Sequence, residues 1–264
     1  MDQKKFFAVV ETDARQRAAA EALRRMGCRV AGAEQTAQAD YIVLPLPLDE
    51  ERVGLAQLLR AAQPGALALG GRISPGAYAA AQQAGIELID YFARPELATL
   101  NAIPTAEGCI SLLLQHRRRT LWSSPVLVVG YGRIGSAVAV RLTALGAQVT
   151  AAARRAEQRA QALAAGCAVT DTALLAQAAP GFDTVVNTVP APLLGEAVLR
   201  GLPPASLIVD LASRPGGTDF AAARALGHTA LQALSLPAVC APVSAGEFVA
   251  RTVLEILAER GEPV

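Results

Sequence analysis

The run VLVVGYGRIG, residues 126–135, is the feature that most constrains the fold of this chain. A short apolar stretch leads into Gly130, Gly132 and Gly135 at G-x-G-x-x-G spacing, and a stretch predicted to be helical, 136–145, follows directly. A strand, a tight turn and a helix in this order direct backbone N–H groups and the positive end of the helix dipole toward phosphates. This context favours a dinucleotide site over a tight turn without a ligand. The predicted cofactor-binding residues are Gly130, Tyr131, Gly132, Arg133, Ile134 and Gly135.

Stretches typical of strands and of helices alternate on both sides of this run. The other predicted strands are 6–11, 28–33, 41–46, 66–69, 86–91, 148–152, 184–188, 207–211 and, more weakly, 229–234. Helices are predicted at 14–26, 49–62, 75–84, 156–165, 172–178, 193–199, 218–226 and 245–259. This alternation is typical of parallel sheets covered by helices. We therefore predict an α/β fold with two Rossmann-like doubly wound parallel-sheet domains joined by long crossing helices.

The two halves of the chain repeat the same rhythm, and 264 residues suffice for two domains. Residues 1–100 are predicted to form an N-terminal Rossmann-like or flavodoxin-like substrate domain, and 123–242 the NAD(P)-binding Rossmann domain. Between them we expect an interdomain helix in 101–122, with Pro104 in its first turn and Thr105 and Glu107 close behind. Residues 243–264 are expected to form a C-terminal helix that packs back toward the N-terminal domain.

Charge and residue usage exclude several classes of function. The formal net charge is +1, so nothing favours nucleic acid or an acidic membrane surface as a partner. No apolar run reaches about 18 residues without a charge or a breaker, and we expect a soluble, cytoplasmic protein. The two lysines, Lys4 and Lys5, both lie at the N-terminus, which argues against a catalytic lysine. The four cysteines lack metal-ligand spacing, so no metal site is predicted.

The residues after the second strand of the nucleotide-binding unit bear on the choice of cofactor. An NAD site usually carries an acidic residue there for the ribose 2′-hydroxyl, whereas arginine accommodates the 2′-phosphate of NADP. This chain has Arg154 and Arg155 at that place, and Glu157 comes too late, inside the predicted helix. Because guanidinium groups bind phosphate bidentately, we predict NADP, with NAD as second choice. An ordinary basic loop is the alternative, more so for Arg155 than for Arg154.

Two further strand ends carry polar residues. The first holds Asn187, Thr188, Val189 and Pro190; Pro190 stops the strand and would leave polar side chains at the rim, level with a nicotinamide ribose. Asn and Thr in such turns also bond their own backbone, and both interpretations stay open. The second is the loop DLASRPGGTD, where Leu211, Ala212 and Ser213 are predicted to line the cofactor, and Ser213 and Arg214 to bind an anionic substrate.

Few side chains are available for acid/base chemistry. His116 falls on the predicted interdomain helix and His228 in a turn, so neither is expected in the cleft. Glu107, near the domain crossing, or water would carry any proton transfer. The alternative is that Glu107 only stabilises a helix N-terminus.

The motifs taken together resemble one known family. GYGRIG followed by AARR, NTVP, DLASRPGGTDF and APVSAG, with NAIPTAEG upstream, is similar to the A subunits of dipicolinate synthase, from about residue 13 to residue 259. DLASRPGGTDF and NAIPTAEG are far more specific than the glycine motif. The resemblance implies an NADP-linked oxidoreductase that oxidises dihydrodipicolinate to dipicolinate in the mother cell during sporulation. It also implies a hetero-oligomer with the flavoprotein-like B subunit of dipicolinate synthase; a homodimer is a further expectation.

The resemblance also suggests roles for charged residues. The substrate carries two carboxylates, for which Arg214 is the first candidate, and Arg72 or Arg94 of the N-terminal domain the second. Asn101, Thr105 and Glu107 would position the substrate or relay its proton, with Thr105, Glu107 and Arg214 as the catalytic set. The protein itself need only orient the substrate and neutralise charge, because hydride transfer belongs to the nicotinamide.

The chain departs from the family pattern at two places. A Gly-Gly-Asp-x-Arg turn is replaced by residues 11–15, ETDAR, which keep Asp13 and Arg15. Val243 stands where the family has a lysine, and this removes a possible carboxylate-binding cation. Two other functions therefore stay open. One is a related two-domain NAD(P)-dependent dehydrogenase of a hydroxy or amino acid, and the other is a cofactor-binding scaffold whose partner carries the chemistry.

Overall fold

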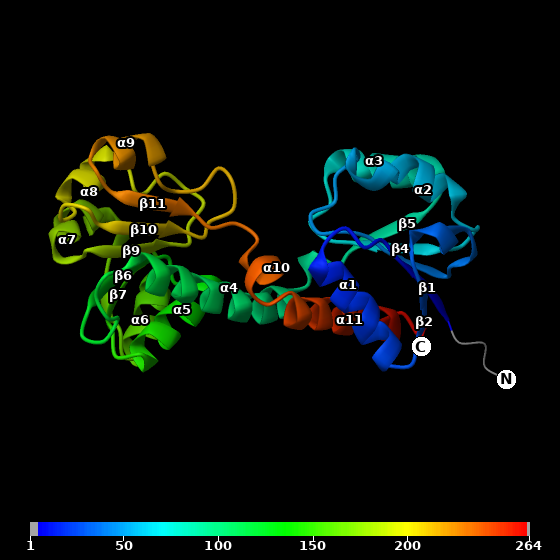
Figure 1. Ribbon diagram of the computed structural model, residues 1–264, viewed down its shortest axis with the longest axis horizontal. Coiled ribbons are helices and arrows are strands. Elements are labelled where there is room, and N and C mark those ends of the chain that lie inside the picture. The colour runs from blue at the N-terminus through cyan, green and yellow to red at the C-terminus, as the bar shows by residue number, and fades with distance from the viewer. Residues whose placement is uncertain (1–4, 263–264) are drawn as a thin grey trace. The chain divides into compact units, whose positions relative to one another are not determined.

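The computed structural model describes residues 5–262, which form two compact units. The first runs to Asn101 and includes the segment from Ala241 onward, and the second is Ala102–Cys240. Each unit contains one parallel sheet with helices on both faces (Figure 1). The predicted fold class, two doubly wound α/β domains, is confirmed.

The first unit has a five-stranded sheet in the order β2-β1-β3-β4-β5. Its strands are β1 Phe6–Val9, β2 Arg29–Ala31, β3 Tyr41–Val43, β4 Leu67–Gly70 and β5 Glu87–Asp90. Its helices are α1 Ala14–Arg25, α2 Leu55–Ala61, α3 Pro75–Ala84 and α11 Pro242–Glu259, with 3₁₀ segments at Ala33–Gln38, Arg52–Gly54 and Tyr91–Ala93. This order is that of flavodoxin-like sheets, which bind ligands beyond the carboxyl ends of their strands.

Alternate residues of each strand bury against different helices. Phe7 and Val9 of β1 face α1 and α11, whereas Phe6 and Ala8 face α2 and α3. The carboxylate of Asp13 caps α1 by accepting from the backbone N–H of Gln16 at 2.9 Å. The predicted helix 49–62 is shorter in the structure, because Val53 and Gly54 have positive φ and α2 begins only at Leu55.

Helix α4, Pro95–His116, begins in the first unit and continues into the second. It starts six residues before the predicted helix start at Asn101, so Pro104 lies inside the helix and the prediction that it occupies the first turn is wrong. Pro95 takes the first-turn position, where a missing N–H costs no hydrogen bond. Burial of the residues beside it, Ala102, Thr105 and Ala106, outweighs the helix-breaking preference of Pro104.

Among the described residues, α4 is the helix whose length and mean hydropathy of 1.4 would also allow a membrane span. Ala106, Cys109 and Leu113 on one side of it are buried in the core of the second unit. Burial of that face accounts for the apolar composition of the helix.

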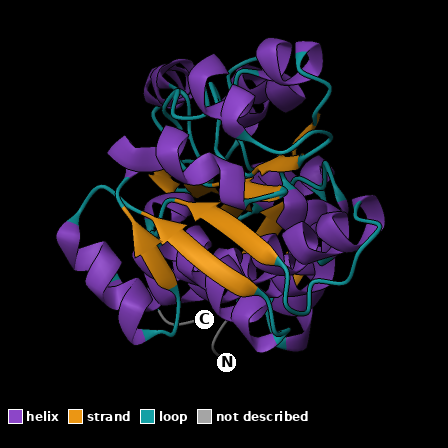
Figure 2. Ribbon diagram, turned by 90° about the vertical axis from the view of Figure 1, so that its left-hand side faces the viewer, coloured by secondary structure: helices purple, strands orange, loops and turns teal. Residues whose placement is uncertain are grey.

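The second unit has a six-stranded sheet in the order β11-β10-β9-β6-β7-β8, and Figure 2 shows helices on both of its faces. Its strands are β6 Pro125–Val129, β7 Gln148–Ala152, β8 Ala168–Thr170, β9 Thr184–Asn187, β10 Leu207–Asp210 and β11 Thr229–Gln232. Its helices are α5 Arg133–Ala144, α6 Ala156–Ala164, α7 Leu175–Ala178, α8 Glu196–Gly201, α9 Phe220–Ala225 and α10 Leu236–Cys240, with 3₁₀ segments at Thr172–Leu174 and Ala179–Gly181. This is the strand order of dinucleotide-binding Rossmann domains.

The core of the second unit also divides between two faces. Val126 and Val128 of β6 pack toward α4 and α5, and Leu127 and Val129 toward α7, α8 and α9. One strand and one α-helix are missing from the sequence predictions. Strand β8 has no fully buried residue and lies at the sheet edge, so it lacks an apolar signal, and α10 is a single short turn.

Candidate functional site

The glycine run forms the connection between β6 and α5. Gly130 adopts φ +93°, a left-handed conformation that favours glycine. A Cβ at this position would also collide with the Thr188 hydroxyl and lie 2.6 Å from a methyl group of Val189. Gly130 is therefore required both by the backbone turn and by close packing against the loop that follows β9.

The other two glycines have different surroundings. A Cβ at Gly135 would overlap the carbonyl oxygen of Gly130, so this position lets α5 pack closely on the turn. A Cβ at Gly132 would meet nothing within 4 Å, and Gly132 caps α5 without a side chain. The first turn of α5 is thus open at Gly132, with Arg133 exposed beside it and Tyr131 and Gly135 buried. The backbone there has the form that admits a pyrophosphate.

The strand order brings the predicted site segments together at one edge of the sheet. Strands β10, β9, β6 and β7 are neighbours and run parallel, so their carboxyl ends lie side by side. The segments that follow them begin at Leu211, Thr188, Gly130 and Ala153 respectively. The chain reverses its winding direction between β6 and β9, the place where such sheets bind their ligands.

The polar residues at the end of β9 hold the loop itself. The Asn187 side chain is fully buried; its amide donates to the carbonyl of Val189, and its oxygen accepts from the N–H of Val189, both at 3.1 Å. The Thr188 hydroxyl donates to the carbonyl of Val129 at 2.9 Å. Of the two interpretations that the sequence left open for Asn187, the structure favours the second, because its amide bonds its own turn and does not lie at the rim. A cofactor would meet the backbone of this loop rather than the Asn187 amide.

Asp210, at the end of β10, is a functional candidate that sequence reasoning missed. Its carboxylate is fully buried and accepts from the N–H groups of Ala212 at 2.9 Å and of Gly217 at 3.0 Å. A Cβ at Gly217 would lie 2.5 Å from the Asn187 amide nitrogen. Asp210 therefore closes the loop 211–217 and fixes it against the loop after β9. The sequence pattern that could have revealed Asp210 is an acidic residue at the end of an apolar strand, with a Gly-Gly pair at residues 216–217.

The tip of this loop carries the predicted anion-binding residues. Ser213 and Arg214 are exposed, and Leu211 and Ala212 are buried below them. Within residues 5–262 the Arg214 guanidinium has no carboxylate partner. The loop thus presents an unneutralised cation at the same sheet edge as the glycine turn.

The loop after β7 contains the predicted NADP determinants. Arg154 and Arg155 are exposed, and Arg155 lies 4.0 Å from Glu157, both side chains being well exposed. The Arg154 guanidinium has no ion-pair partner in the described part of the chain. Arg159, which the sequence predictions did not single out, donates to the carbonyls of Ala153 and Arg154. The loop is therefore held from the α6 side.

The two predicted substrate arginines of the first unit, Arg72 and Arg94, differ in whether an acidic side chain already neutralises them. Arg72 is exposed on the loop after β4, and its backbone N–H donates to the Asp90 carboxylate at 3.0 Å. Arg94 instead forms a short ion pair with Glu259 and lies 3.8 Å from Glu96. The Glu259 carboxylate raises the pKa of Arg94. Arg94 is thus already neutralised, which argues against its predicted carboxylate role, whereas the role of Arg72 stays a prediction.

The motif residues Asp13 and Arg15 lie at the start of α1. The Arg15 side chain is buried and donates to the Asp13 carboxylate at 3.1 Å and, by a short hydrogen bond, to the carbonyl of Leu46. Arg15 therefore ties the connection after β1 to the segment after β3. These are the two neighbouring strands at which the winding of this sheet reverses.

The predicted proton-transfer residues all lie on α4. Thr105 is buried, Asn101 is partly buried, and Glu107 is exposed, with its carboxylate 3.8 Å from the Arg141 guanidinium. Glu107 is inside the helix, so the alternative that it stabilises a helix N-terminus is wrong. Arg141 is eight residues into α5, about 12 Å along the axis from its first turn. The catalytic role of Glu107 stays a prediction, and this ion pair places it away from the glycine turn.

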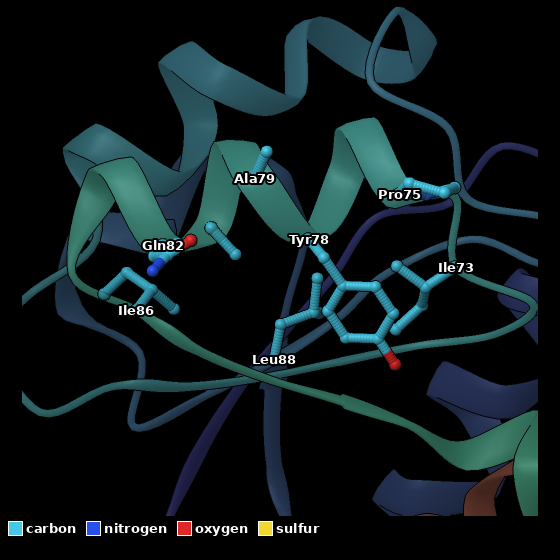
Figure 3. A pocket seen from close by; sticks show the side chains of 8 residues that line it. Ile73, Pro75, Tyr78, Ala79, Gln82, Ile86 and Leu88 are labelled. Carbon is cyan, nitrogen blue, oxygen red and sulfur yellow. The ribbon is translucent and has the colours of Figure 1, made fainter.

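The two histidines and a surface groove lie apart from the predicted site segments. His228 contacts the carbonyl of Leu199 at 2.9 Å, and His116 is exposed at the end of α4. A groove of about 720 Å³ runs between α3 and β5, where Figure 3 shows the ring of Tyr78 between Ile73 and Leu88. None of the predicted site residues lines it. Within residues 5–262 no group of three or more His, Cys, Asp or Glu side chains is placed to hold a metal ion.

Comparison with known proteins identifies the second unit. Residues 111–222 match the family described as D-isomer specific 2-hydroxyacid dehydrogenase, NAD binding domain. This match covers α5 and the loops that follow β6, β7, β9 and β10. The second unit is therefore a nicotinamide-nucleotide-binding domain of the dehydrogenase type.

Individual relatives that match a larger part of the chain identify a narrower family. The dipicolinate synthase A subunit of Bacillus subtilis (strain 168) is 41% identical over 179 residues, which span 68% of this chain and 60% of the length of that relative. The crystal structure of dipicolinate synthase, A chain, from Bacillus subtilis has a TM-score of 0.86 at 31% identity, covering 98% of this chain and 97% of that one. The corresponding structure from Bacillus halodurans has a TM-score of 0.86 at 27% identity, covering 96% of this chain and 98% of that one. The chain belongs to the family of dipicolinate synthase A subunits.

Proposed function

We propose that this protein is an NADP-dependent oxidoreductase that converts dihydrodipicolinate to dipicolinate, acting with the B subunit of dipicolinate synthase as its partner. Dihydrodipicolinate gives a hydride to the nicotinamide of NADP⁺ and releases one proton, so the products are dipicolinate, NADPH and H⁺. We place this activity in the cytoplasm of the mother cell during sporulation. The family relationship supports the reaction, and the residues at the carboxyl edge of the second sheet support the manner of binding.

The glycine turn fits the phosphates of a dinucleotide. A cofactor bound there would supply the hydride acceptor. The backbone N–H groups at the start of α5 and the exposed Arg133 would hold its pyrophosphate, because nothing fills the space beside Gly132. The loop after β9, fixed by Asn187 and Thr188, would then border the nicotinamide ribose.

One observation carries the choice of substrate class: the exposed Arg214 guanidinium without a carboxylate partner among the described residues. It lies on the loop after β10, at the same edge of the sheet as the glycine turn after β6. A guanidinium binds a carboxylate by two parallel hydrogen bonds and so fixes the orientation of a planar ring acid. We therefore assign Arg214, with the hydroxyl of Ser213, to one carboxylate of the substrate.

The proton step needs little from the protein. Loss of a hydride and a proton makes the ring aromatic, so a strong base is unnecessary. Thr105 is buried and Glu107 is exposed beside Arg141. We assign them no more than an indirect part, and water accepts the proton.

The preference for NADP rests on Arg154. Its guanidinium is exposed and has no acidic partner within the described residues, and no acidic side chain ends β7. Titration calorimetry with NADP and NAD tests this assignment. Arg154→Asp should weaken NADP binding by at least about tenfold and NAD binding much less. Equal losses for the two cofactors would remove Arg154 from the site.

A turnover assay separates the proposed function from its competitors. The purified protein is given NADP and freshly made dihydrodipicolinate, with and without the partner B subunit, and NADPH formation is followed. Turnover by the protein alone excludes a scaffold without chemistry. Arg214→Leu should raise the KM for dihydrodipicolinate while NADP affinity stays nearly constant. Oxidation of hydroxy or amino acids instead of dihydrodipicolinate would establish the alternative dehydrogenase.

A further inference from the structure

Helix α6 contacts both segments of the cofactor site through two neighbouring side chains, Gln158 and Arg159. The Gln158 amide donates to the carbonyl of Tyr131, inside the glycine turn, at 3.1 Å. One nitrogen of Arg159, Nη1, donates to the carbonyls of Ala153 and Arg154, both at 2.7 Å. We call Gln158 and Arg159 the α6 brace, because they join the loops after β6 and after β7 through one helix.

The charge of Arg159 is compensated inside the protein. Its Nη1 lies 2.6 Å from the Asp171 carboxylate, and the two side chains are 28% and 33% exposed. The other oxygen of Asp171 accepts from the N–H of Ala173 at 3.0 Å, so Asp171 is itself fixed at the end of β8. Arg159 is therefore a partly buried, oriented cation that organises backbone, not a cation available to a ligand.

The brace determines how the loop after β7 is turned. Both carbonyls at 153 and 154 point to the α6 side, and any other turn of the loop would lose two charge-assisted hydrogen bonds to Arg159. Three arginines lie within six residues here: Arg159 is paired with Asp171 at 2.6 Å, and Arg155 lies 4.0 Å from Glu157 at a well-exposed position. The exposed Arg154 is left as the uncompensated cation of the loop.

We propose that Arg159 is a positioning residue for cofactor specificity: it holds Arg154 at a fixed place relative to the glycine turn and thereby sets the preference for a 2′-phosphorylated dinucleotide. Gln158 fixes the same helix to the glycine turn. This inference rests on the proposed function of Arg154. It predicts that specificity is lost when Arg159 is changed, although Arg159 does not touch the cofactor.

The test measures dissociation constants for NADP and NAD by calorimetry in a double-mutant cycle. Arg159→Gln should raise the Kd for NADP by about tenfold, since the loss is that of a charge-assisted interaction. The Kd for NAD should change by no more than about twofold. In the Arg154→Asp background, Arg159→Gln should have no further effect on NADP, because a residue that acts through another is coupled to it.

Two further variants guard against misfolding and define the control. Asp171→Asn keeps the acceptor for Ala173 but removes the charge beside Arg159, and it should produce a smaller loss of NADP affinity in the same direction. Arg200→Gln removes an exposed arginine that pairs with Glu196 on α8, and it should change neither Kd. Thermal unfolding of every variant shows whether a change in affinity follows a change in stability.

The outcomes separate this inference from the function it rests on. If Arg154→Asp weakens NADP and NAD equally, the proposed NADP site is wrong. If Arg154→Asp is selective but Arg159→Gln weakens both cofactors equally, or adds its full effect to that of Arg154→Asp, Arg159 only stabilises the fold and the inference is overturned. If Arg159→Gln does not fold, Asp171→Asn provides the test. An unchanged ratio of the NADP and NAD dissociation constants in that variant would overturn the inference.

Discussion

The carbonyl oxygen of Gly130 lies so close to Gly135 that it would overlap a Cβ atom at residue 135. Two glycines five residues apart are thus in backbone contact, and this contact sets how closely α5 packs on the end of β6. The requirement for glycine at 135 comes from the protein itself, and it exists without any ligand.

Gly135→Ala should therefore destabilise the protein in the absence of cofactor. Relieving the overlap requires a shift of backbone, and overpacking of this kind costs about 1–3 kcal/mol. Urea unfolding of the cofactor-free protein measures the change. Gly181→Ala is the matched control, because a Cβ at residue 181 meets nothing within 4 Å. Equal stability of the two variants would show that the turn relaxes freely.

Gly132→Ala should have the opposite profile. Its φ of −92° suits alanine and a Cβ there would meet nothing within 4 Å, but glycine is a better N-cap than alanine, so the free energy of unfolding should fall by no more than about 1 kcal/mol. The added methyl group would stand in the space assigned to the pyrophosphate. Calorimetry should show NADP affinity reduced by about tenfold or more. Unchanged affinity in a stable variant would mean that the pyrophosphate does not approach Gly132.

Local sequence was sufficient to predict the bounds of elements whose ends are set by their own or adjacent residues. The strand 148–152 and the helix 75–84 were predicted with the bounds that the structure has. Ser74 caps the helix just before its first residue, Pro75, and Gly85, with φ +68°, caps its carboxyl end. These signals lie inside the element or next to it, so they can be read without knowledge of the fold.

Contacts between distant residues could not be predicted in this way. Arg94 is neutralised by Glu259, which lies 165 residues away, and no pattern near Arg94 indicates this. The Asn187 amide was open to two interpretations because its use depends on where the carbonyl of Val189 turns. Pro104 lies mid-helix because buried packing outweighs a local preference, and sequence alone does not weigh the two.

The two cysteines Cys109 and Cys240 should differ sharply in reactivity. Burial raises the pKa of the Cys109 thiol to about 12, whereas Cys240 is exposed. At pH 8 an alkylating reagent should label Cys240 within minutes and leave Cys109 unmodified until the protein is denatured, because only thiolates react. Mass spectrometry of peptides identifies the labelled site, and Cys240→Ser is the control. Labelling of Cys109 in the native protein would contradict its burial.

The same shift has a consequence for stability at alkaline pH. The folded pKa of Cys109 is raised above its unfolded value, so its contribution to stability is present below the unfolded pKa and is lost as pH rises toward about 12. Cys109→Ala should therefore lose less stability than the parent protein between about pH 9 and pH 11. Urea unfolding across this range measures the difference, and parallel curves for the two proteins would contradict the assignment.

Asp210→Asn should disorder the loop that carries Arg214. The carboxylate accepts from the buried N–H groups of Ala212 and Gly217, and an amide can accept only through its single oxygen. One buried donor then loses its partner and faces another donor, which costs about 1–3 kcal/mol. Gly217 packs the loop against Asn187. Loss of the hydrogen bond to Gly217 should therefore also displace Arg214, which lies on the same loop.

The expected result for Asp210→Asn is a higher KM for dihydrodipicolinate and faster amide hydrogen exchange in residues 211–217, with exchange in α5 unchanged. Asp219→Asn is the matched control: Asp219 caps α9 through the N–H of Ala222, and asparagine caps as well. Its stability and KM should stay near those of the parent protein. A raised KM without faster exchange would mean that Asp210 acts on the substrate by its charge. Unchanged values of both would show that the glycines alone hold Arg214 in place.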